Sequence, residues 1–396
     1  MELKMIRKFH IFQLLSGWFI FSLLLSNFVV YAMGTPPPKR KPHYIHVAVV
    51  KNASQLTLSI KGKYKILAPY TNEVLLNGNS LNIARVLPTH SGIKINKYLF
   101  KIFALKIKPS QKAAIFLNKY RLRGNLAIIR QKNGSLLAVN EIDIEDYLCG
   151  VLRAEVSPHW PIEALKAQAV AARTFALYYN LLRKDKDYEL DNTVYSQIYA
   201  GVRQETRRTT QAVRQTAGEV LTYKQNLFPA FFHATCAGRT ENANKLWNID
   251  IPPLKGVTCP FCKGSPHYSW KAKISLSQIK KKLNKNGYKI GEIVHLSPLG
   301  RDKSGRIEKI EIQDKQKKNI IIEANKFRLI ICPDLIRSTN FKLLIKNKQV
   351  FFQGKGWGHG VGLCQWGAYF MAKQGFNYRQ ILKYYYPGAE IINNRQ

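Results

Sequence analysis

Between residues 44 and 140, apolar side chains gather in short segments of the length typical of β-strands. Gly, Pro, Asn and Ser stand between these segments, as turn residues stand between strands. The segments richest in branched and aromatic residues are Val47–Val50, Leu56–Ile60, Ile93–Ile95, Leu99–Ile107 and Leu126–Ile129. The pattern predicts a β-rich N-terminal region over residues 44–135.

The spacing of the apolar residues changes near Ile144, where steps of three and four residues begin. Such steps place side chains on one face of an amphipathic helix, here Ile144, Leu148, Val151, Leu152 and Glu155. Pro158 and Pro161 interrupt this helix. A second helix is predicted for Ile162–Leu182, because its many alanines favour the helix and allow close packing against a neighbour.

After residue 205 the apolar spacing alternates between segments typical of helices and segments typical of strands. A third helix is predicted for Glu205–Thr216, and strands follow from Val220 onward. The clearest of these strands are Glu308–Ile312, Ile320–Glu323, Phe341–Ile345 and Val350–Phe352, and two final helices are predicted for Ala368–Lys373 and Tyr378–Tyr385. We therefore predict an α+β fold with a central helical segment between β-rich regions.

The first 33 residues have the pattern of an export signal. Lys4, Arg7 and Lys8 precede an uncharged apolar run that extends to about Ala32, and Val30–Ala32 offers small residues for cleavage. The run is also long enough to cross a bilayer uncleaved. Residues 1–33 are thus predicted to be a signal peptide or an N-terminal membrane anchor, followed by a stiff Pro-rich basic linker over 34–43. We expect an exported protein, periplasmic or on the cell-wall side of the membrane, secreted or anchored.

The charge of the 396-residue chain indicates its partners more than its fold. Lys and Arg number 62 against 24 Asp and Glu, a formal net charge of +38, which attracts polyanions. Export makes nucleic acid an unsuitable partner and leaves the cell wall and the membrane surface. A basic membrane-binding or nucleic-acid-binding protein stays as an alternative that only the charge supports.

Glu155 is the first candidate for chemistry. A carboxyl group on the apolar face of a helix, just before Pro158, loses water, and this raises its pKa toward that of a general acid at neutral pH. The structural alternative is a helix-end Glu paired with Arg153, Arg173 or a backbone amide. Periodicity alone favours that alternative.

A series of ordered motifs changes this balance. They are Asn140–Leu148, Gly150–Pro158, Glu163–Thr174, Ser196–Gly201, Phe232–Thr240, Ser304–Arg306, Phe327–Arg328, Ser338–Phe341 and Gly354–Ala368. Together they resemble the SpoIID/LytB family over roughly residues 115–390. The resemblance implies a two-lobed SpoIID-like domain, and we assign residues 136–390 to this catalytic region.

The resemblance also implies an activity. Family members are lytic transglycosylases of peptidoglycan, and the Glu that matches Glu155 is their catalytic acid/base. Their substrate is glycan stripped of its stem peptides by an amidase. One carboxyl group suffices when the muramic acid's own hydroxyl attacks and forms a 1,6-anhydro ring, so no cofactor is needed for catalysis. Other proteins with this domain enhance a cell-wall amidase, so a non-catalytic glycan-binding enhancer is the alternative function.

Further residues are expected around a groove between the two lobes. Gln168, Arg173 and Gln197 match family positions near the cleft, although Arg173 also suits a structural ion pair. In the Gly-rich segment Gly354–Gly367, His359 and Gln365 suit hydrogen bonds to sugar hydroxyls or to Glu155. Trp357 and Trp366 offer flat faces to sugar rings, and equally suit structural packing.

The cysteines suggest a structural metal site. His233, Cys236, Cys259 and Cys262 supply the donors of a closed zinc site, with His267 as a competing ligand. A disulfide between Cys236 and Cys259 or Cys262 is the alternative, which an oxidising compartment favours. Some family members bind zinc just before the Gln that matches Gln197, but residues 192–196 hold no such ligand. Cys149, Cys332 and Cys364 are predicted to be small buried apolar residues.

Overall fold

The computed structural model describes residues 41–184, 186–193 and 196–394. The predicted signal peptide or anchor, and all but the end of the linker, lie outside the described residues. Within the described ranges, no helix combines the length and the apolar character needed to cross a membrane.

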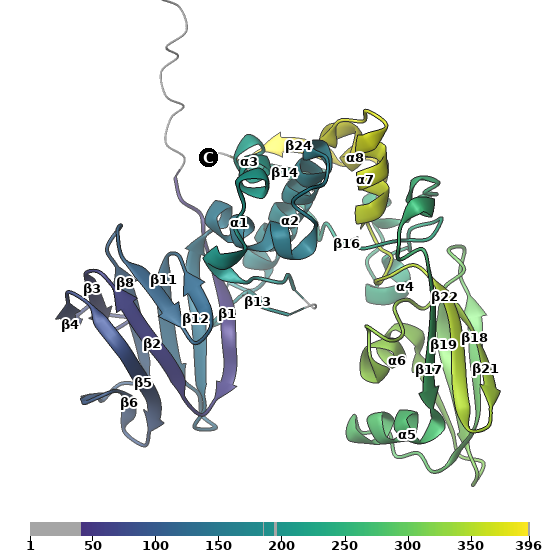
Figure 1. Ribbon diagram of the computed structural model, residues 1–396, viewed down its shortest axis with the longest axis horizontal. Coiled ribbons are helices and arrows are strands. Elements are labelled where there is room, and N and C mark those ends of the chain that lie inside the picture. The colour runs from purple at the N-terminus through teal and green to yellow at the C-terminus, as the bar shows by residue number, and fades with distance from the viewer. Residues whose placement is uncertain (1–40, 185, 194–195, 395–396) are drawn as a thin grey trace, which may run out of the picture. The chain divides into compact units, whose positions relative to one another are not determined.

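The chain first forms two antiparallel β-sheets (Figure 1). One sheet has the order β13-β1-β12-β11-β8-β3-β4, in which only the short β13 runs parallel to its neighbour; the other has the order β10-β9-β2-β5-β6-β7. In β2, Leu56, Leu58 and Ile60 alternate inward with polar residues, as expected for a strand with one buried face. The strands are β1 (Tyr44–Ala53), β2 (Leu56–Lys61), β3 (Tyr64–Leu67), β4 (Val74–Gly78), β5 (Leu81–Thr89), β6 (Gly92–Ile95), β7 (Tyr98–Phe100), β8 (Ala104–Pro109), β9 (Ala114–Leu117), β10 (Tyr120–Leu122), β11 (Asn125–Arg130), β12 (Leu136–Asp143) and β13 (Leu190–Asp191).

Two details differ from the sequence-based prediction. The single strand predicted for Leu99–Ile107 is two strands, because the chain leaves one sheet after β7 and enters the other at β8. The boundary predicted at residues 135/136 falls between β11 and β12, which are hydrogen-bonded neighbours. That boundary therefore does not separate two sheets.

Three helices follow the sheets: α1 (Ile144–Glu155), α2 (Ile162–Leu182) and α3 (Arg207–Gln215), the last preceded by the 3-10 turn η1 (Gly201–Gln204). The N-cap Asp143 accepts a hydrogen bond from Glu145 N at 3.0 Å and starts α1. α1 contains Gly150 because a Cβ there would lie 2.7 Å from the Tyr199 ring. Side chains from both sheets and from α1 and α2 share one large apolar cluster.

A second apolar cluster lies within residues 270–352. It is built on two three-stranded sheets, with the orders β17-β22-β21 and β18-β19-β20 (Figure 1). The strands are β17 (Ser269–Ser275), β18 (Ile293–Arg301), β19 (Ile307–Asp314), β20 (Asn319–Glu323), β21 (Phe341–Lys346) and β22 (Gln349–Lys355). Helices α5 (Leu276–Lys285) and α6 (Ala324–Ile331) pack their apolar side chains into this cluster, and the sequence pattern had not predicted either helix.

The remaining elements return to the first cluster. β14 (Glu219–Tyr223) pairs with β15 (Asn226–Leu227) and with β24 (Glu390–Asn393), and β16 (Phe232–His233) pairs with β23 (Leu363–Cys364). The other segments are α4 (Asn244–Trp247), η2 (Pro252–Leu254), η3 (Phe261–Gly264), α7 (Gln365–Lys373) and α8 (Tyr378–Tyr385). The α+β class is confirmed, while the two-lobed arrangement stays a prediction.

Candidate functional site

Glu155 is the last residue of α1. Seven residues of this helix are buried, and they hold its end in place against the large apolar cluster. Val156, with extended backbone, ends the helix before Pro158. The Glu155 side chain is half-buried, and its Oε1 accepts a hydrogen bond from Ile198 N at 3.0 Å.

The environment of Glu155 shifts its pKa as expected for a general acid. Burial raises the pKa of Glu155 to about 7. The hydrogen bonds from Ile198 N and Gln365 lower this pKa, but their effect is smaller than that of burial. No charged side chain of the described residues contributes to this shift. The ion pair with Arg153 or Arg173, which the sequence had left open, is therefore not formed, whereas the pairing with a backbone amide is formed through Ile198 N.

Gln365 and Gln168 adjoin this carboxyl group. Gln365, the first residue of α7, hydrogen-bonds to Glu155, and its Nε2 lies 3.4 Å from Gln168 Oε1. Gln168 comes from the middle of α2 and is buried. Its Nε2 has no hydrogen-bond partner among the described residues. The structure thus brings Glu155, Gln168 and Gln365 together from three helices.

Aromatic rings adjoin the same helix ends. Trp366 contacts Trp160, with ring centroids 5.1 Å apart, and Tyr369, at 5.2 Å. Trp160 belongs to the segment between α1 and α2, and all three rings are partly exposed. Sequence reasoning missed Trp160 and Tyr369, although Trp160 stands only five residues after Glu155.

Gln197 has an indirect part in this site. Its Oε1 accepts a hydrogen bond from Tyr147 Oη at 2.9 Å, and its Nε2 donates to the Ala172 carbonyl at 3.1 Å. The side chain is buried, so both ends of the amide serve the protein. Gln197 holds the segment whose Ile198 N contacts Glu155, and this placement argues against the predicted contact with substrate.

Arg173 is structural, which corrects its prediction as a substrate-binding residue. Its side chain is fully buried, and Nε and Nη2 donate to both carboxylate oxygens of Glu145 at 2.9 and 2.7 Å. The remaining donors contact the Glu219 and Val213 carbonyls. Because the side chain has no exposed surface, it cannot contact a sugar.

His359 belongs to a different group of side chains. Its Nδ1 accepts a hydrogen bond from Val361 N at 3.1 Å, and its ring lies 5.1 Å from Trp247 and 5.7 Å from His233, centroid to centroid. Burial lowers its pKa well below the usual value, so the ring is neutral. The structure therefore places His359 with Trp247 and His233, and not in hydrogen-bond contact with Glu155.

Trp357 packs against protein groups. The Arg337 guanidinium lies 4.9 Å from its ring centroid, and the His267 ring lies 4.5 Å away. A pocket of about 750 Å³ is lined by Trp270, Arg301 and Phe341, among others, and includes none of the predicted substrate-binding residues. The groove expected beside Glu155 stays a prediction.

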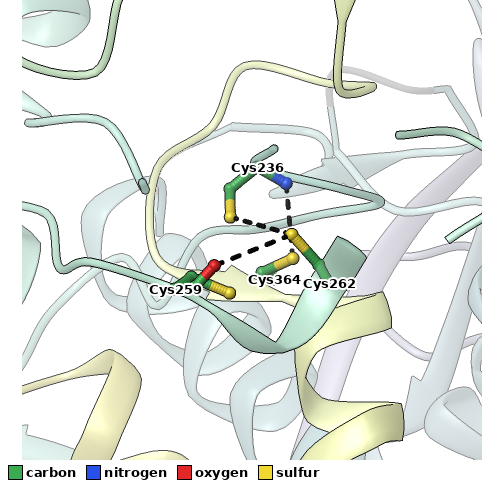
Figure 2. Close-up of side chains that lie close together, drawn as sticks. All are labelled: Cys236, Cys259, Cys262 and Cys364. Carbon is green, nitrogen blue, oxygen red and sulfur yellow. Dashed lines mark hydrogen bonds between the residues drawn. The ribbon is translucent and has the colours of Figure 1, made fainter. Parts of the chain in front are cut away.

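Four cysteines form a buried cluster. The sulfur atoms of Cys236, Cys259, Cys262 and Cys364 all lie within 4.8 Å of one another, and Figure 2 shows the four side chains together. All six cysteines of the chain are free thiols. The disulfide between Cys236 and Cys259 or Cys262 is thus not formed.

The predicted ligand set needs a correction, because Cys364 takes the place given to His233. His233 Nδ1 contacts the Val361 carbonyl at 3.1 Å, and its ring lies outside the group of four sulfurs. Sequence reasoning did not identify Cys364 as the fourth member of the cluster, because it lies more than 100 residues after Cys262 and has no second Cys near it. β16 and β23 bring the two segments together, pairing His233 with Cys364.

Comparison with known proteins identifies the family. A family model described as "Stage II sporulation protein" (SpoIID) matches residues 132–223, and one described as "Domain of unknown function (DUF8618)" matches residues 261–362. The chain is 33% identical over 350 residues to an uncharacterized protein of Brachyspira hyodysenteriae, covering 88% of this chain and 93% of that protein.

Two relatives from Bacillus subtilis carry functional names. Stage II sporulation protein D is 33% identical over 307 residues, covering 73% of this chain and 84% of that protein. The amidase enhancer is 29% identical over 290 residues, covering 62% of this chain and 40% of that protein. The chain belongs to the SpoIID/LytB family, and its role concerns the cell wall.

Proposed function

We propose that this protein is a lytic transglycosylase that cuts peptidoglycan glycan strands with Glu155 as its general acid and base. The observation that supports it most is the pKa of Glu155, which burial raises to about 7. At neutral pH a large share of the carboxyl groups keeps its proton. A protonated carboxyl group can give that proton to a leaving oxygen.

The reaction balances with this one carboxyl group. Glu155 protonates the glycosidic oxygen of muramic acid as the bond to C1 breaks. The resulting carboxylate then takes the proton of the muramic acid C6 hydroxyl, whose oxygen forms the new bond to C1. The product is a 1,6-anhydro ring, and Glu155 ends protonated, as it began. Enzymes that use water or a covalent intermediate need a second carboxylate close by, whereas the internal attack of the C6 hydroxyl needs only one.

The neighbours of Glu155 have positioning and binding roles in this proposal. Ile198 N and the Gln365 amide orient the carboxyl group. Gln168 is buried next to Gln365, so its role in this proposal is to position the Gln365 amide and not to contact the sugar. The partly exposed rings of Trp160 and Trp366 offer apolar faces to pyranose rings.

Location and partners follow from the same proposal. The export pattern of residues 1–33 supports a location outside the cytoplasm, with the membrane as a contact if the segment stays uncleaved. The charge of +38 favours the acidic wall and no nucleic-acid partner is expected. The glycan is expected to be free of stem peptides, and the cysteine cluster is expected to hold a structural metal ion that takes no part in catalysis.

The test uses stem-free glycan strands and mass spectrometry of the products. The wild-type protein should create 1,6-anhydromuramic ends, and Glu155→Gln should create none. Glu323→Gln is the matched control, since it makes the same change at an exposed carboxylate. Intact strands with the wild-type protein would refute the proposal.

The second candidate function is a non-catalytic enhancer that binds glycan and stimulates a cell-wall amidase. The 29% identity to a protein named amidase enhancer favours it. In that case the wild-type protein and Glu155→Gln should stimulate a purified wall amidase equally while leaving glycan strands uncut. If the wild-type protein cleaves glycan and Glu155→Gln does not, the protein is an enzyme and not only an enhancer.

A further inference from the structure

We infer that Cys236, Cys259, Cys262 and Cys364 bind one structural zinc ion through four thiolates, with Cys364 as the fourth ligand. All four cysteines are fully buried. They come from the loop after β16, the segment around the start of η3 and the end of β23, so the ion would join segments up to 128 residues apart.

The spacing of the sulfurs fits a tetrahedral zinc site. Zinc–thiolate bonds of about 2.3 Å put the sulfurs of a tetrahedron about 3.8 Å apart. Cys236 Sγ and Cys262 Sγ lie 3.5 Å apart, and all four sulfurs lie within 4.8 Å of one another. A disulfide requires about 2.05 Å, so the arrangement suits a shared ion better than two disulfides.

The surroundings of the sulfurs also favour bound thiolates. Cys364 Sγ accepts hydrogen bonds from Cys236 N at 3.3 Å and from Gly367 N at 3.4 Å. Cys364 is the N-cap of α7, where the helix end favours a negative charge. Tyr385 Oη lies 3.1 Å from Cys259 Sγ. These hydrogen bonds are of the kind that orient and stabilise metal ligands.

Other residues keep the ligands close together. A Cβ at position 367 would lie 3.0 Å from Cys259 Sγ, so a glycine lets the first turn of α7 approach the sulfurs. Buried Arg306 donates from Nη2 to the Cys236 carbonyl at 3.1 Å and from Nη1 to the Arg239 carbonyl at 3.2 Å. The motif Ser304–Arg306 thereby supports the loop that carries Cys236.

The site has a consequence for Glu155. Cys364 immediately precedes Gln365, whose amide contacts both Glu155 and Gln168. A zinc ion would anchor the start of α7 and so fix Gln365 as a positioning residue. The metal site itself does not depend on the proposed catalysis, because its tests measure metal and thiols.

Zinc is measured on the full-length chain after expression with added zinc and removal of loosely bound metal. The expected result is one zinc ion per chain, with the four cluster thiols unreactive until a chelator removes the metal. Cys364→Ser should lose the zinc. Cys332→Ser, a half-buried cysteine outside the cluster, and His233→Ala should keep it.

X-ray absorption of the wild-type protein tests the ligands without any substitution. Four sulfur neighbours at about 2.3 Å are expected. A nitrogen ligand together with zinc loss in His233→Ala would overturn the inference and restore His233 to the site. Wild-type protein without metal, or with disulfides among these four cysteines, would overturn it as well.

Discussion

Helix α1 carries two glutamates that the protein treats in opposite ways. Glu145, in the first turn, accepts hydrogen bonds from Arg173 Nε and Nη2 and from Gly218 N. Glu155, the last residue, has no ion pair with any described residue and accepts from Ile198 N and Gln365. The two carboxyl groups share a helix and both contact the protein interior.

These different partners make Glu145 a structural carboxylate and leave the Glu155 carboxyl group available for proton transfer. Glu145 forms a two-point ion pair with the buried Arg173 guanidinium and accepts a third hydrogen bond from Gly218 N. The pKa of Glu155 is raised to about 7, so its proton can be given and taken near neutral pH. The motifs Asn140–Leu148 and Gly150–Pro158, which contain the two residues, do not show this difference, whereas the partners of each carboxyl group do.

The largest expected effect is on catalysis. Glu155→Gln should lower the rate of glycan cleavage by about 10²–10⁴-fold, because the amide can neither give nor take the proton. The rate is measured as new 1,6-anhydro ends per time at saturating glycan. A rate within tenfold of wild type would show that Glu155 is not the acid.

The next effect is on stability and concerns the other glutamate. Glu145→Gln should lower the free energy of unfolding by about 3–5 kcal/mol, because it leaves the buried Arg173 charge without its partner. Lys245→Gln is the control, since it breaks an exposed pair with Glu308 and should lower the free energy of unfolding far less. Equal losses in denaturant unfolding would contradict the structural role of Glu145.

The pH dependence of the rate should follow the pKa of Glu155. kcat/KM should fall about tenfold per pH unit well above pH 7, where the free enzyme loses the required proton. Gln365→Leu should move this limb to higher pH, because the Gln365 hydrogen bond lowers the pKa. If the fall of kcat/KM occurs at the same pH in Gln365→Leu as in the wild type, Gln365 does not influence the pKa of the catalytic acid.

Stability should also depend on pH through Glu155. Its pKa is about 7 in the folded state against 4.5 in the reference state, so the unfolded chain loses this proton first as pH rises. The wild type should therefore lose stability relative to Glu155→Gln between about pH 4.5 and pH 7, on the order of 1–3 kcal/mol. Differential unfolding of both proteins at pH 4.5 and pH 8 measures this, and a constant difference would refute the raised pKa.

The smallest effect concerns the support of the site. Tyr147→Phe should destabilise the fold by about 1–2 kcal/mol, because it leaves the buried Gln197 Oε1 without its donor. Tyr98→Phe is a control with an exposed hydroxyl-bearing ring. Glycan cleavage should fall less than with Glu155→Gln. If unfolding of the two Tyr variants is indistinguishable, Gln197 does not depend on Tyr147.

Helices with a strong local signal were predicted accurately. The structure has Ile162–Leu182 and Tyr378–Tyr385 as predicted, because alanines, apolar spacing and flanking Pro or Asn act within the segment itself. α6 was missed because it is short and contains three isoleucines and leucines in its last residues, a composition that strands also have. Its helical state depends on packing Phe327 and Ile331 into the second cluster.

The candidate site likewise contains residues that local sequence identifies and residues whose roles depend on distant contacts. Helix period and the following proline placed Glu155 at a helix end, and the resemblance to the SpoIID/LytB family then made it the catalytic candidate. The roles of Arg173, Gln197 and His359 could not be found from the sequence, since each depends on partners elsewhere in the chain, such as Glu145, Tyr147 and Trp247. Residue type shows what a side chain can bind, but not which of its donors the protein already uses.

The sequence by itself determined the α+β class, the resemblance to the SpoIID/LytB family and the position of Glu155. Only the tertiary structure decided which carboxylate of α1 is paired, and that Cys364, not His233, completes the cysteine cluster. The physical reason is that spacing along the chain governs contacts over one or two helical turns. Burial and pairing depend on segments that folding brings together from far apart.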